Sequence, residues 1–394
     1  MKAVFCVTND LNTDQRMIRI CSTLQAAGWE VELIGRKKSN SSELLERTFK
    51  QTRLNCIFQR GKFFYLEYNL RLWFYLLFLK MDLLCVIDLD TALPGIFMKN
   101  FRSIYLVYDA HELFPMVPEV RNRKMVQRIW FWVERRIFKK ADLIYTVGSA
   151  LADYFQQKYH RKVEVIRNMP MSLSAESNFG IIELNSVASD SKTSNTAKSK
   201  TANAAESNIP QIPFNDGTFI LYQGALNQGR GLERLLRILI QEEFPLLLVG
   251  SGDVEAELKQ FVRDNRLQDR VHFMGFVRPE LLPQITRKAR MGYNVSENEG
   301  LSYYLSLNNK FFDYVEAKLP SLINDFPEYV ALTQEFKVGL VAELNDTVIA
   351  EKLRMLMKND EIYQECVENC IKAREIWSWK NESQKLIDLY NSFL

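Results

Sequence analysis

The sequence predicts an α/β protein with two parallel sheets in tandem, each covered by helices. Short runs rich in β-branched and aromatic residues alternate with segments of helical period along most of the chain. This alternation is typical of parallel sheets, because a parallel strand pair needs a crossover connection. The chain has 394 residues, of which 47% are hydrophobic and 25% charged, so it can bury two separate cores.

The first domain is expected at residues 1–170. A strand at Ala3–Thr8 leads to a helix at Gln15–Ala27, which Gly28 ends, and a second strand follows at Val31–Gly35. Further short β-rich runs lie at Leu83–Asp88, Ile104–Asp109, Leu143–Val147 and Val163–Ile166.

The second domain is expected at residues 216–370 and repeats the pattern. Its strands are expected at Phe219–Gln223, Leu246–Gly250, Val271–Met274, Met291–Val295, Ser321–Asn324 and Gly339–Ala342. Its helices are expected at Leu232–Glu242, Val254–Asn265, Asn309–Ala317 and Thr347–Met357. Residues 371–394 predict one last helix, with an apolar stripe formed by Trp377, Leu386, Leu389 and Phe393.

Residues 171–215 separate the two domains and differ from them in composition. They are rich in Ser, Thr, Asn and Ala and contain few aromatic residues, so they predict a flexible low-complexity insert. The six cysteines form no C-x-x-C pair, which argues against a zinc ribbon or a disulfide scaffold and favours a reducing, cytoplasmic location. The longest apolar run, Leu72–Leu79, is far shorter than the roughly 20 residues of a membrane-spanning helix.

The charge is distributed unevenly between the domains. Residues 1–170 contain 27 Lys and Arg against 17 Asp and Glu, whereas the whole chain has a net charge of only +3. Arg121–Lys140 carries eight basic residues and one acid, with Trp130–Trp132 among them. Together with Phe63–Met81, this pattern predicts peripheral docking on an anionic membrane surface, and it fits a membrane better than nucleic acid, which we do not expect as a partner. The alternative is a core helix with a solvated charged face.

Two nucleotide-type domains also suggest a dehydrogenase, but the glycine pattern argues against one. Gly250-Ser251-Gly252 is followed by Glu255 where the third glycine of the dinucleotide motif belongs. The glycines from Gly224 to Gly231 have the wrong spacing. No bound cofactor is therefore expected.

Several runs together resemble the family-4 glycosyltransferases of the GT-B fold, also called glycosyl transferases group 1. In the first domain the runs are Asp14–Met17, Asp88–Thr91, Tyr108–Glu112, Ala141–Ile144 and Val165–Pro170. In the second they are Gly224 with Arg230–Glu233, Val249–Gly252, Phe273–Val277, Asn309–Tyr314 and Leu319–Pro320. The resemblance implies two Rossmann-like domains facing across a cleft, with the C-terminal helix crossing back to the first domain. It also implies transfer of a sugar from a nucleotide-sugar with retention of anomeric configuration and without a metal.

The family resemblance places the donor in the second domain. Breaking the anomeric bond leaves negative charge on the diphosphate, which cations or helix amino ends must neutralise. Arg230, in a Gly-rich turn, and Lys310, at a helix start, are expected to supply that charge, and Asp313 is expected to accept hydrogen bonds from ribose on the same helix face as Asn309 and Lys310. The other expected donor contacts are Gly224, Gly252 and Val277. The alternatives are a solvated loop arginine and an ordinary helix ion pair between Lys310 and Asp313.

The acceptor is expected in the first domain. His111 follows a strand end and is expected to hydrogen-bond a sugar hydroxyl, with Asp109 or Glu112 orienting it; the alternative is a structural histidine. Asp88 and Asp90 resemble the metal-binding D-x-D of another glycosyltransferase fold, but no further ligands accompany them, so they are expected to line the acceptor site without a metal. Asn9 is a further expected acceptor contact.

The sequence departs from the family at two positions. Many members carry two glutamates eight residues apart, and the first position is occupied here by Leu305. Ala225 stands where the family has an arginine. The predicted function is a hexosyltransferase that uses a glycan or lipid-linked acceptor in surface polysaccharide biosynthesis. The alternatives are a degenerate subunit that binds a nucleotide-sugar or a partner without catalysis, and a sugar-nucleotide epimerase.

Overall fold

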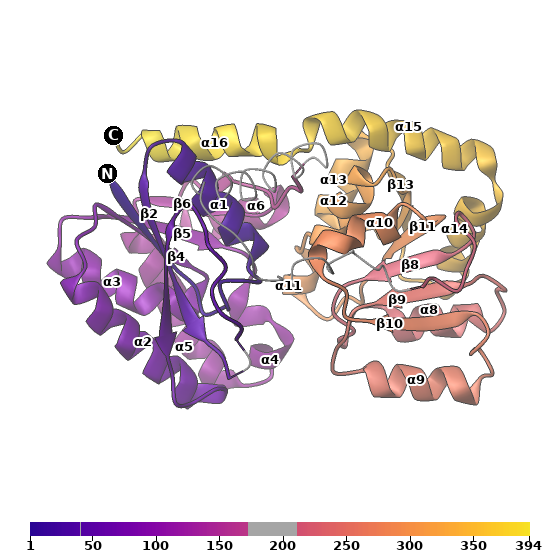
Figure 1. Cartoon of the computed structure of the whole chain (residues 1–394), viewed down its shortest axis with the longest axis horizontal. Coiled ribbons are helices and arrows are strands. Elements are labelled where there is room, and N and C mark those ends of the chain that lie inside the picture. Colours follow the sequence, from indigo (N-terminus) through magenta and orange to yellow (C-terminus); the bar gives the residue numbers. More distant parts are fainter. Residues whose placement is uncertain (40, 172–210) are drawn as a thin grey trace, which may run out of the picture. The chain divides into compact units, whose positions relative to one another are not determined.

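The computed structural model describes residues 1–39, 41–171 and 211–394 and divides into two compact units (Figure 1). Unit 1 contains Met1–Asn168, Glu299–Leu307 and Asn381–Leu394, and unit 2 contains Met169–Asn298 and Asn308–Lys380. Most of the predicted insert, residues 172–210, lies outside the described residues.

Unit 1 contains a seven-stranded parallel sheet in the order β3-β2-β1-β4-β5-β6-β7. Its strands are β1 (Lys2–Cys6), β2 (Glu30–Lys37), β3 (Lys50–Asn55), β4 (Leu83–Ile87), β5 (Tyr105–Ala110), β6 (Leu143–Thr146) and β7 (Glu164–Val165). The sequence did not predict β3, because this edge strand is polar and half-exposed and lacks the alternation of a strand with one buried face.

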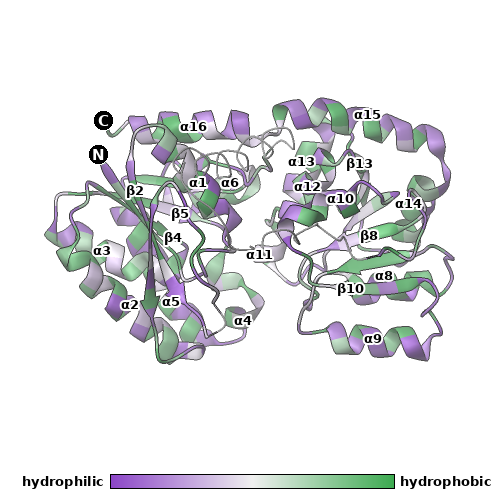
Figure 2. Ribbon diagram, in the orientation of Figure 1, coloured by the Kyte–Doolittle hydropathy of each residue, from purple (hydrophilic) through white to green (hydrophobic). Residues whose placement is uncertain are grey.

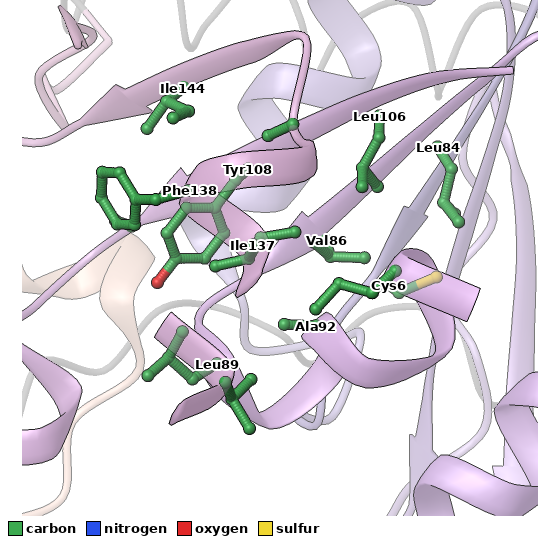
Figure 3. Packing of buried hydrophobic residues seen from close by; sticks show 14 of the residues in the cluster. Cys6, Leu84, Val86, Leu89, Ala92, Leu106, Tyr108, Ile137, Phe138 and Ile144 are labelled. Carbon is green, nitrogen blue, oxygen red and sulfur yellow. The ribbon is translucent and has the colours of Figure 1, made fainter. Parts of the chain in front are cut away.

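Helices cover both faces of this sheet. Figure 1 shows α2 (Gly61–Phe78), α3 (Ala92–Phe101) and α5 (Lys124–Lys140) on one face, and α1 (Gln15–Ala26), α6 (Ser149–Tyr159) and α16 (Trp379–Asn391) on the other. The short helices η1 (Leu89–Thr91), η2 (Phe114–Met116) and α4 (Pro118–Arg121) lie in the loops after β4 and β5. The core includes Val86, Leu106 and Tyr108 of the strands packed on Ile137 and Phe138 of α5 (Figure 3). The central strands β4 and β5 are buried on both faces, as a sheet between two helix layers requires.

Unit 2 contains a six-stranded parallel sheet in the order β10-β9-β8-β11-β12-β13. Its strands are β8 (Ile220–Gln223), β9 (Leu246–Val249), β10 (Val271–Gly275), β11 (Met291–Asn294), β12 (Ser321–Asn324) and β13 (Gly339–Ala342). Its helices are α8 (Leu232–Leu239), α9 (Glu255–Asp264), η3 (Pro279–Leu281), α10 (Leu282–Thr286), α12 (Asn309–Glu316), α13 (Pro327–Glu335), α14 (Asp346–Lys358) and α15 (Asp360–Ile376). Figure 2 shows hydrophobic residues concentrated in the strands of the sheets. Two Rossmann-like domains were predicted, and this prediction is confirmed.

The single helix predicted at 371–394 is wrong. The chain turns at Trp377 and Ser378, between α15 and α16. Trp377 is buried against the rings of Phe311, Phe312 and Phe336 in unit 2. From Asn381 onward α16 belongs to unit 1, where Tyr390 lies 6.0 Å from the ring of Phe5 and 5.9 Å from that of Trp29.

The segment Glu299–Leu307 leaves unit 2 after β11 and belongs to unit 1. It contains α11 (Leu301–Tyr304), a short helix that the sequence pattern did not predict. Leu305 is buried in the hydrophobic core of unit 1, and Glu299 lies 3.7 Å from the guanidinium of Arg121. The side chain at the first glutamate position of the family pattern therefore packs in a core.

Candidate functional site

The order of strands reverses at one place in each sheet, and most of the predicted site residues follow the strands that meet there or the strands beside them. In unit 1, β1 and β4 are neighbours, with Ala3 opposite Leu83. In unit 2, β8 and β11 are neighbours, with Ile220 opposite Met291. Loops that leave the carboxyl ends of such strands diverge, and ligands of open α/β sheets bind between them.

In unit 1 the chain after β4 turns sharply at Asp88. The φ angle of Asp88 is 53° and its ψ angle is 179°, a backbone conformation that residues other than glycine rarely adopt. The turn brings the carboxylate to β5, where Oδ1 accepts the backbone N–H of His111 at 2.8 Å. A strained residue held in this way is typical of a binding or catalytic loop.

His111 lies in a network of charged groups. Its Nε2 is 3.1 Å from Oδ2 of the buried Asp109, and its Nδ1 is 3.6 Å from Oδ2 of Asp88. Burial lowers the pKa of His111, but the carboxylates of Asp109 and Asp88 raise it by more, to about 9. At neutral pH the imidazole is therefore protonated, and its side chain remains 23% exposed. The ring can present a positive charge to a ligand.

Arg16 of α1 forms an ion pair with the carboxylate of Asp109. Its Nη2 donates to Asp109 Oδ1 at 3.0 Å, and its Nη1 donates to the carbonyl of Ile166 at 2.9 Å. Arg16 Nε lies 3.2 Å from Asp109 Oδ2 and 3.0 Å from His111 Nε2. Because a protonated Nε2 is a donor, Arg16 Nε–H is directed to the carboxylate of Asp109. Burial raises the pKa of Asp109, but the charges of Arg16 and His111 outweigh it and lower that pKa below its usual value.

Asp90 connects the loops after β1 and β4. Its Oδ2 accepts the hydroxyl of Thr8 at 2.5 Å, and its side chain is almost completely buried. Burial and the neighbouring charge of Asp88 raise the pKa of Asp90 to about 7. Asn9 is exposed, and its amide donates to Asp14, the N-cap of α1, at 2.9 Å. The predicted acceptor residues thus lie on neighbouring loops of unit 1.

In unit 2, Arg230 ends the glycine-rich loop between β8 and α8. Its Nη1 donates to Oδ1 of Asn308 at 3.0 Å. Asn308 is fixed by two further hydrogen bonds: its backbone N–H donates to Tyr329 Oη at 2.8 Å, and its side-chain amide donates to Asn294 at the end of β11. Asn308 precedes α12, so Arg230 lies near the amino end of that helix.

Lys310 lies in the first turn of α12 and is 8% exposed. Its ammonium nitrogen is 3.7 Å from the ring centroid of Tyr222 on β8. Burial and then the charge of Arg230 lower the pKa of Lys310 well below its usual value, whereas Asp313 raises it. The two predicted phosphate-binding cations are thus close enough to repel one another.

The remaining predicted donor residues take different positions. Asp313 is half-buried and accepts the side-chain amide of Gln223 at 3.3 Å. Asn309 is exposed, whereas Lys310 is buried, so the prediction that the two share one face of α12 is wrong. Successive residues of a helix point about 100° apart, which separates the two side chains. The side chain of Val277 packs in a core cluster, which leaves only its backbone for a ligand.

The glycines of the two loops allow close backbone approach. A Cβ on Gly250 would lie 1.9 Å from the carbonyl oxygen of Gly224, and one on Gly252 would lie 2.2 Å from that of Leu226. The loops after β8 and β9 are therefore packed backbone against backbone. Both Gly224 and Gly252 are exposed and accessible to a ligand.

Two family models match the parts of the chain that carry these loops. Residues 15–169 match Glycosyltransferase Family 4, and residues 218–359 match Glycosyl transferases group 1. The chain belongs to the family-4, group 1 glycosyltransferases. The predicted family is thus confirmed, and the protein is a sugar-transferring enzyme. A search of curated protein sequences finds no significant match.

Solved structures with the same fold share little sequence identity with this chain. Sucrose-phosphate synthase from Thermosynechococcus elongatus is 16% identical with a TM-score of 0.75, over 100% of this chain and 98% of that chain. Anabaena HepE in complex with UDP-glucose is 14% identical with a TM-score of 0.71, over 100% of both chains. WaaG, a glycosyltransferase involved in lipopolysaccharide biosynthesis, is 13% identical with a TM-score of 0.67, over 98% of this chain and 99% of that chain.

Sequence reasoning did not assign a role to Arg16 or Asn308. Arg16 is 95 residues from His111 and Asn308 is 78 residues from Arg230, so no local spacing connects these pairs. Across the described ranges, no group of three or more His, Cys, Asp or Glu is arranged to hold a metal ion. Within the same described residues, no helix is long and apolar enough to cross a membrane.

Proposed function

We propose that this glycosyltransferase transfers a hexose from a nucleotide-sugar, with retention of configuration and without a metal, to a glycan or lipid-linked acceptor in surface polysaccharide biosynthesis. The donor is held by unit 2 and the acceptor by unit 1. The enzyme works in the cytoplasm, at the inner face of the membrane. The observation that carries this proposal is the position of two basic side chains at the reversal point of the unit 2 sheet: Arg230 donates to Asn308 before α12, and Lys310 is buried in the first turn of α12.

A diphosphate bound there relieves the repulsion. It gives Arg230 a bidentate partner and Lys310 a counter-charge, and the amino end of α12 adds favourable N–H groups. As the sugar leaves, the same groups stabilise the charge that develops on the nucleotide. The structures of HepE with UDP-glucose support a uridine nucleotide as the first donor to test.

On unit 1, protonated His111 donates a hydrogen bond to a sugar hydroxyl. Asp109 and Arg16 hold the ring in place, and Asp88 fixes the backbone of His111. Asp88, Asp90 and Asn9 contact the acceptor in this proposal. Each role follows from the position of these groups after β1, β4 and β5.

The test is nucleotide release from UDP-, GDP- and ADP-sugars in the presence of sugar acceptors and EDTA, with NMR of the product anomer. We expect one of these donors to raise the melting temperature of the protein. We expect the enzyme to transfer the sugar of that donor with retention of its anomeric configuration. Arg230→Ala should lower kcat by about 10²-fold or more, as expected when a group that stabilises transition-state charge is lost. An inverted product or an absolute need for a divalent metal would contradict the proposal.

A non-catalytic subunit that binds a nucleotide-sugar is the second candidate function. The observation in its favour is Leu305, which occupies the first glutamate position and is buried in the core of unit 1. Donor binding without turnover across the acceptor panel would support it. Epimer formation without any acceptor would instead indicate an epimerase.

A further inference from the structure

We propose that the outer sides of α2, α3 and α5 form one surface that docks on an anionic lipid bilayer. We call it the docking face. It extends the proposed use of a lipid-linked acceptor, but it rests on a different part of unit 1 from His111 and Asp88. The three helices cover the same face of the unit 1 sheet (Figure 1), α3 packs against both α2 and α5, and their outer sides therefore point away from the sheet together.

The outer side of α2 is apolar along its whole length. Its exposed large hydrophobic residues follow a helical spacing of three or four, and between 47% and 86% of each is accessible to solvent: Phe63, Leu66, Leu70, Phe74 and Phe78. The stripe is about 22 Å long at 1.5 Å per residue. The opposite side of the helix, including Phe64, Tyr68 and Leu72, is buried in the core of unit 1. The helix therefore cannot bury the exposed stripe by rotating without losing that core.

Helix α5 contributes the positive charge of the docking face. Met125, Ile129 and Trp132 are 69%, 56% and 41% exposed and lie at i, i+4 and i+7 on one side of the helix. Exposed basic residues surround them, among them Arg128, Arg135, Arg136, Lys139 and Lys140. The guanidinium of Arg136 lies 4.0 Å from the ring of Trp132.

No exposed acid offsets this charge on α5. Its one acidic residue, Glu134, is buried and accepts the ammonium of Lys158 at 2.6 Å. On α2 the single acid, Glu67, is paired with Arg71. An apolar stripe with a basic border is the chemistry that binds the interface of an anionic bilayer, where aliphatic and aromatic side chains enter the headgroup region and basic groups meet the phosphates.

The same charge argues against a second copy of the chain as the occupant. A two-fold interface places the same patch on both subunits. The exposed basic groups of the two α5 helices would then meet across the interface. Helix α3 adds Phe97 and Phe101, 47% and 74% exposed, so the apolar area also exceeds that of a charged, solvated helix face.

The test is sedimentation of the full chain with vesicles, without donor or acceptor. Phosphatidylcholine vesicles are compared with vesicles that contain about 30% phosphatidylglycerol, at low and high salt. We expect binding only to the anionic vesicles, and we expect salt to weaken it. Leu70→Gln with Phe74→Gln, and separately Lys139→Gln with Lys140→Gln, should each weaken binding at least tenfold. The matched controls in unit 2, Ile240→Gln and Lys352→Gln with Lys372→Gln, should bind like the unaltered protein.

Equal binding to neutral and anionic vesicles, no binding to either, or unchanged binding of both docking-face variants would overturn the proposal. So would a dimer in analytical ultracentrifugation that Leu70→Gln with Phe74→Gln dissociates, since a second copy would then cover the face. The altered side chains are exposed, except for the half-buried Lys352, so circular dichroism should show unchanged folding. Nucleotide release with a water-soluble acceptor should stay unchanged in these variants, which separates failure of docking from failure of the proposed transfer reaction.

Discussion

Single side chains in the two candidate sites carry charges that the fold itself disfavours. Lys310 is buried beside another cation, and Asp90 is buried beside another carboxylate. Each lies on a loop or helix end at the reversal point of its sheet. Such groups reduce stability in the free protein and are retained where a ligand or a reaction uses them.

We predict that Lys310→Met separates stability from donor binding. The folded-state pKa of Lys310 is below its value in the unfolded chain, so the unfolded chain binds more protons and stability rises with pH between these two pKa values. The variant lacks this penalty and should be more stable than the unaltered protein at neutral pH. It should bind the donor about 10- to 100-fold more weakly, because a charge-assisted hydrogen bond is lost. Urea unfolding and calorimetric titration check both effects, and unaltered donor affinity would contradict the phosphate role.

We predict a pH-dependent gain in stability for Asp90→Asn. The folded-state pKa of about 7 exceeds the usual 3.8, so the folded protein binds more protons in this range and loses stability as pH rises from about 4 to about 7. The amide cannot ionise, and the variant should be more stable than the unaltered protein by roughly 1–3 kcal/mol at pH 8. The difference should vanish near pH 4. Asp269→Asn, at an exposed position, is the control and should show no such trend in urea unfolding.

At the scale of elements, the shape of the proposed donor site depends on the close approach of the loops after β8 and β9. The loop after β9 packs on the loop after β8 through the backbones of Gly250 and Gly224. The same approach orders the start of α9, because the N–H of Val254 donates to the carbonyl of Leu226. The proposed donor site is therefore shaped by backbone contact as well as by Arg230 and Lys310.

We predict that Gly250→Ala damages both the fold and the donor site. The φ angle of Gly250 is +136°, and the added methyl group would meet the oxygen of Gly224. We expect a loss of roughly 2–4 kcal/mol in the free energy of unfolding, together with loss of donor binding. Gly217→Ala is the matched control, because its φ angle is +74° but nothing lies within 4 Å of the added carbon. It should cost about 1 kcal/mol and leave binding intact.

At the scale of the whole molecule, the chain passes between its units more than once. Glu299–Leu307 and the C-terminal residues from Asn381 complete unit 1, although they follow long stretches of unit 2. The carboxylate of Glu382 accepts the backbone N–H of Arg167 at 2.7 Å, and Tyr390 contacts Phe5 of the first strand. The C-terminal residues therefore complete the packing of unit 1.

We predict that Tyr390→Ala destabilises unit 1 by about 3–5 kcal/mol, as expected for a buried aromatic side chain. Tyr390→Phe should cost only about 1 kcal/mol, because it loses only the hydroxyl contacts with Tyr145, at 3.2 Å, and with the thiol of Cys85. Donor binding in unit 2 should be unchanged in both variants. Calorimetry with and without donor checks this, and a loss of donor affinity in Tyr390→Ala would show that unit 2 also depends on α16.

The sequence by itself determined every described strand except β3, the two-sheet fold and the loops that carry Arg230, Lys310 and His111. These features follow from local periodicity and from short turns rich in glycine, and both signals lie within short consecutive segments of the sequence. Only the tertiary structure decided that Arg16 supports His111, that Asn308 holds Arg230, that Leu305 packs in unit 1, and that the last helix is broken at Trp377. The physical reason is that strand order and burial join residues far apart in the chain, and no spacing within one segment encodes those contacts.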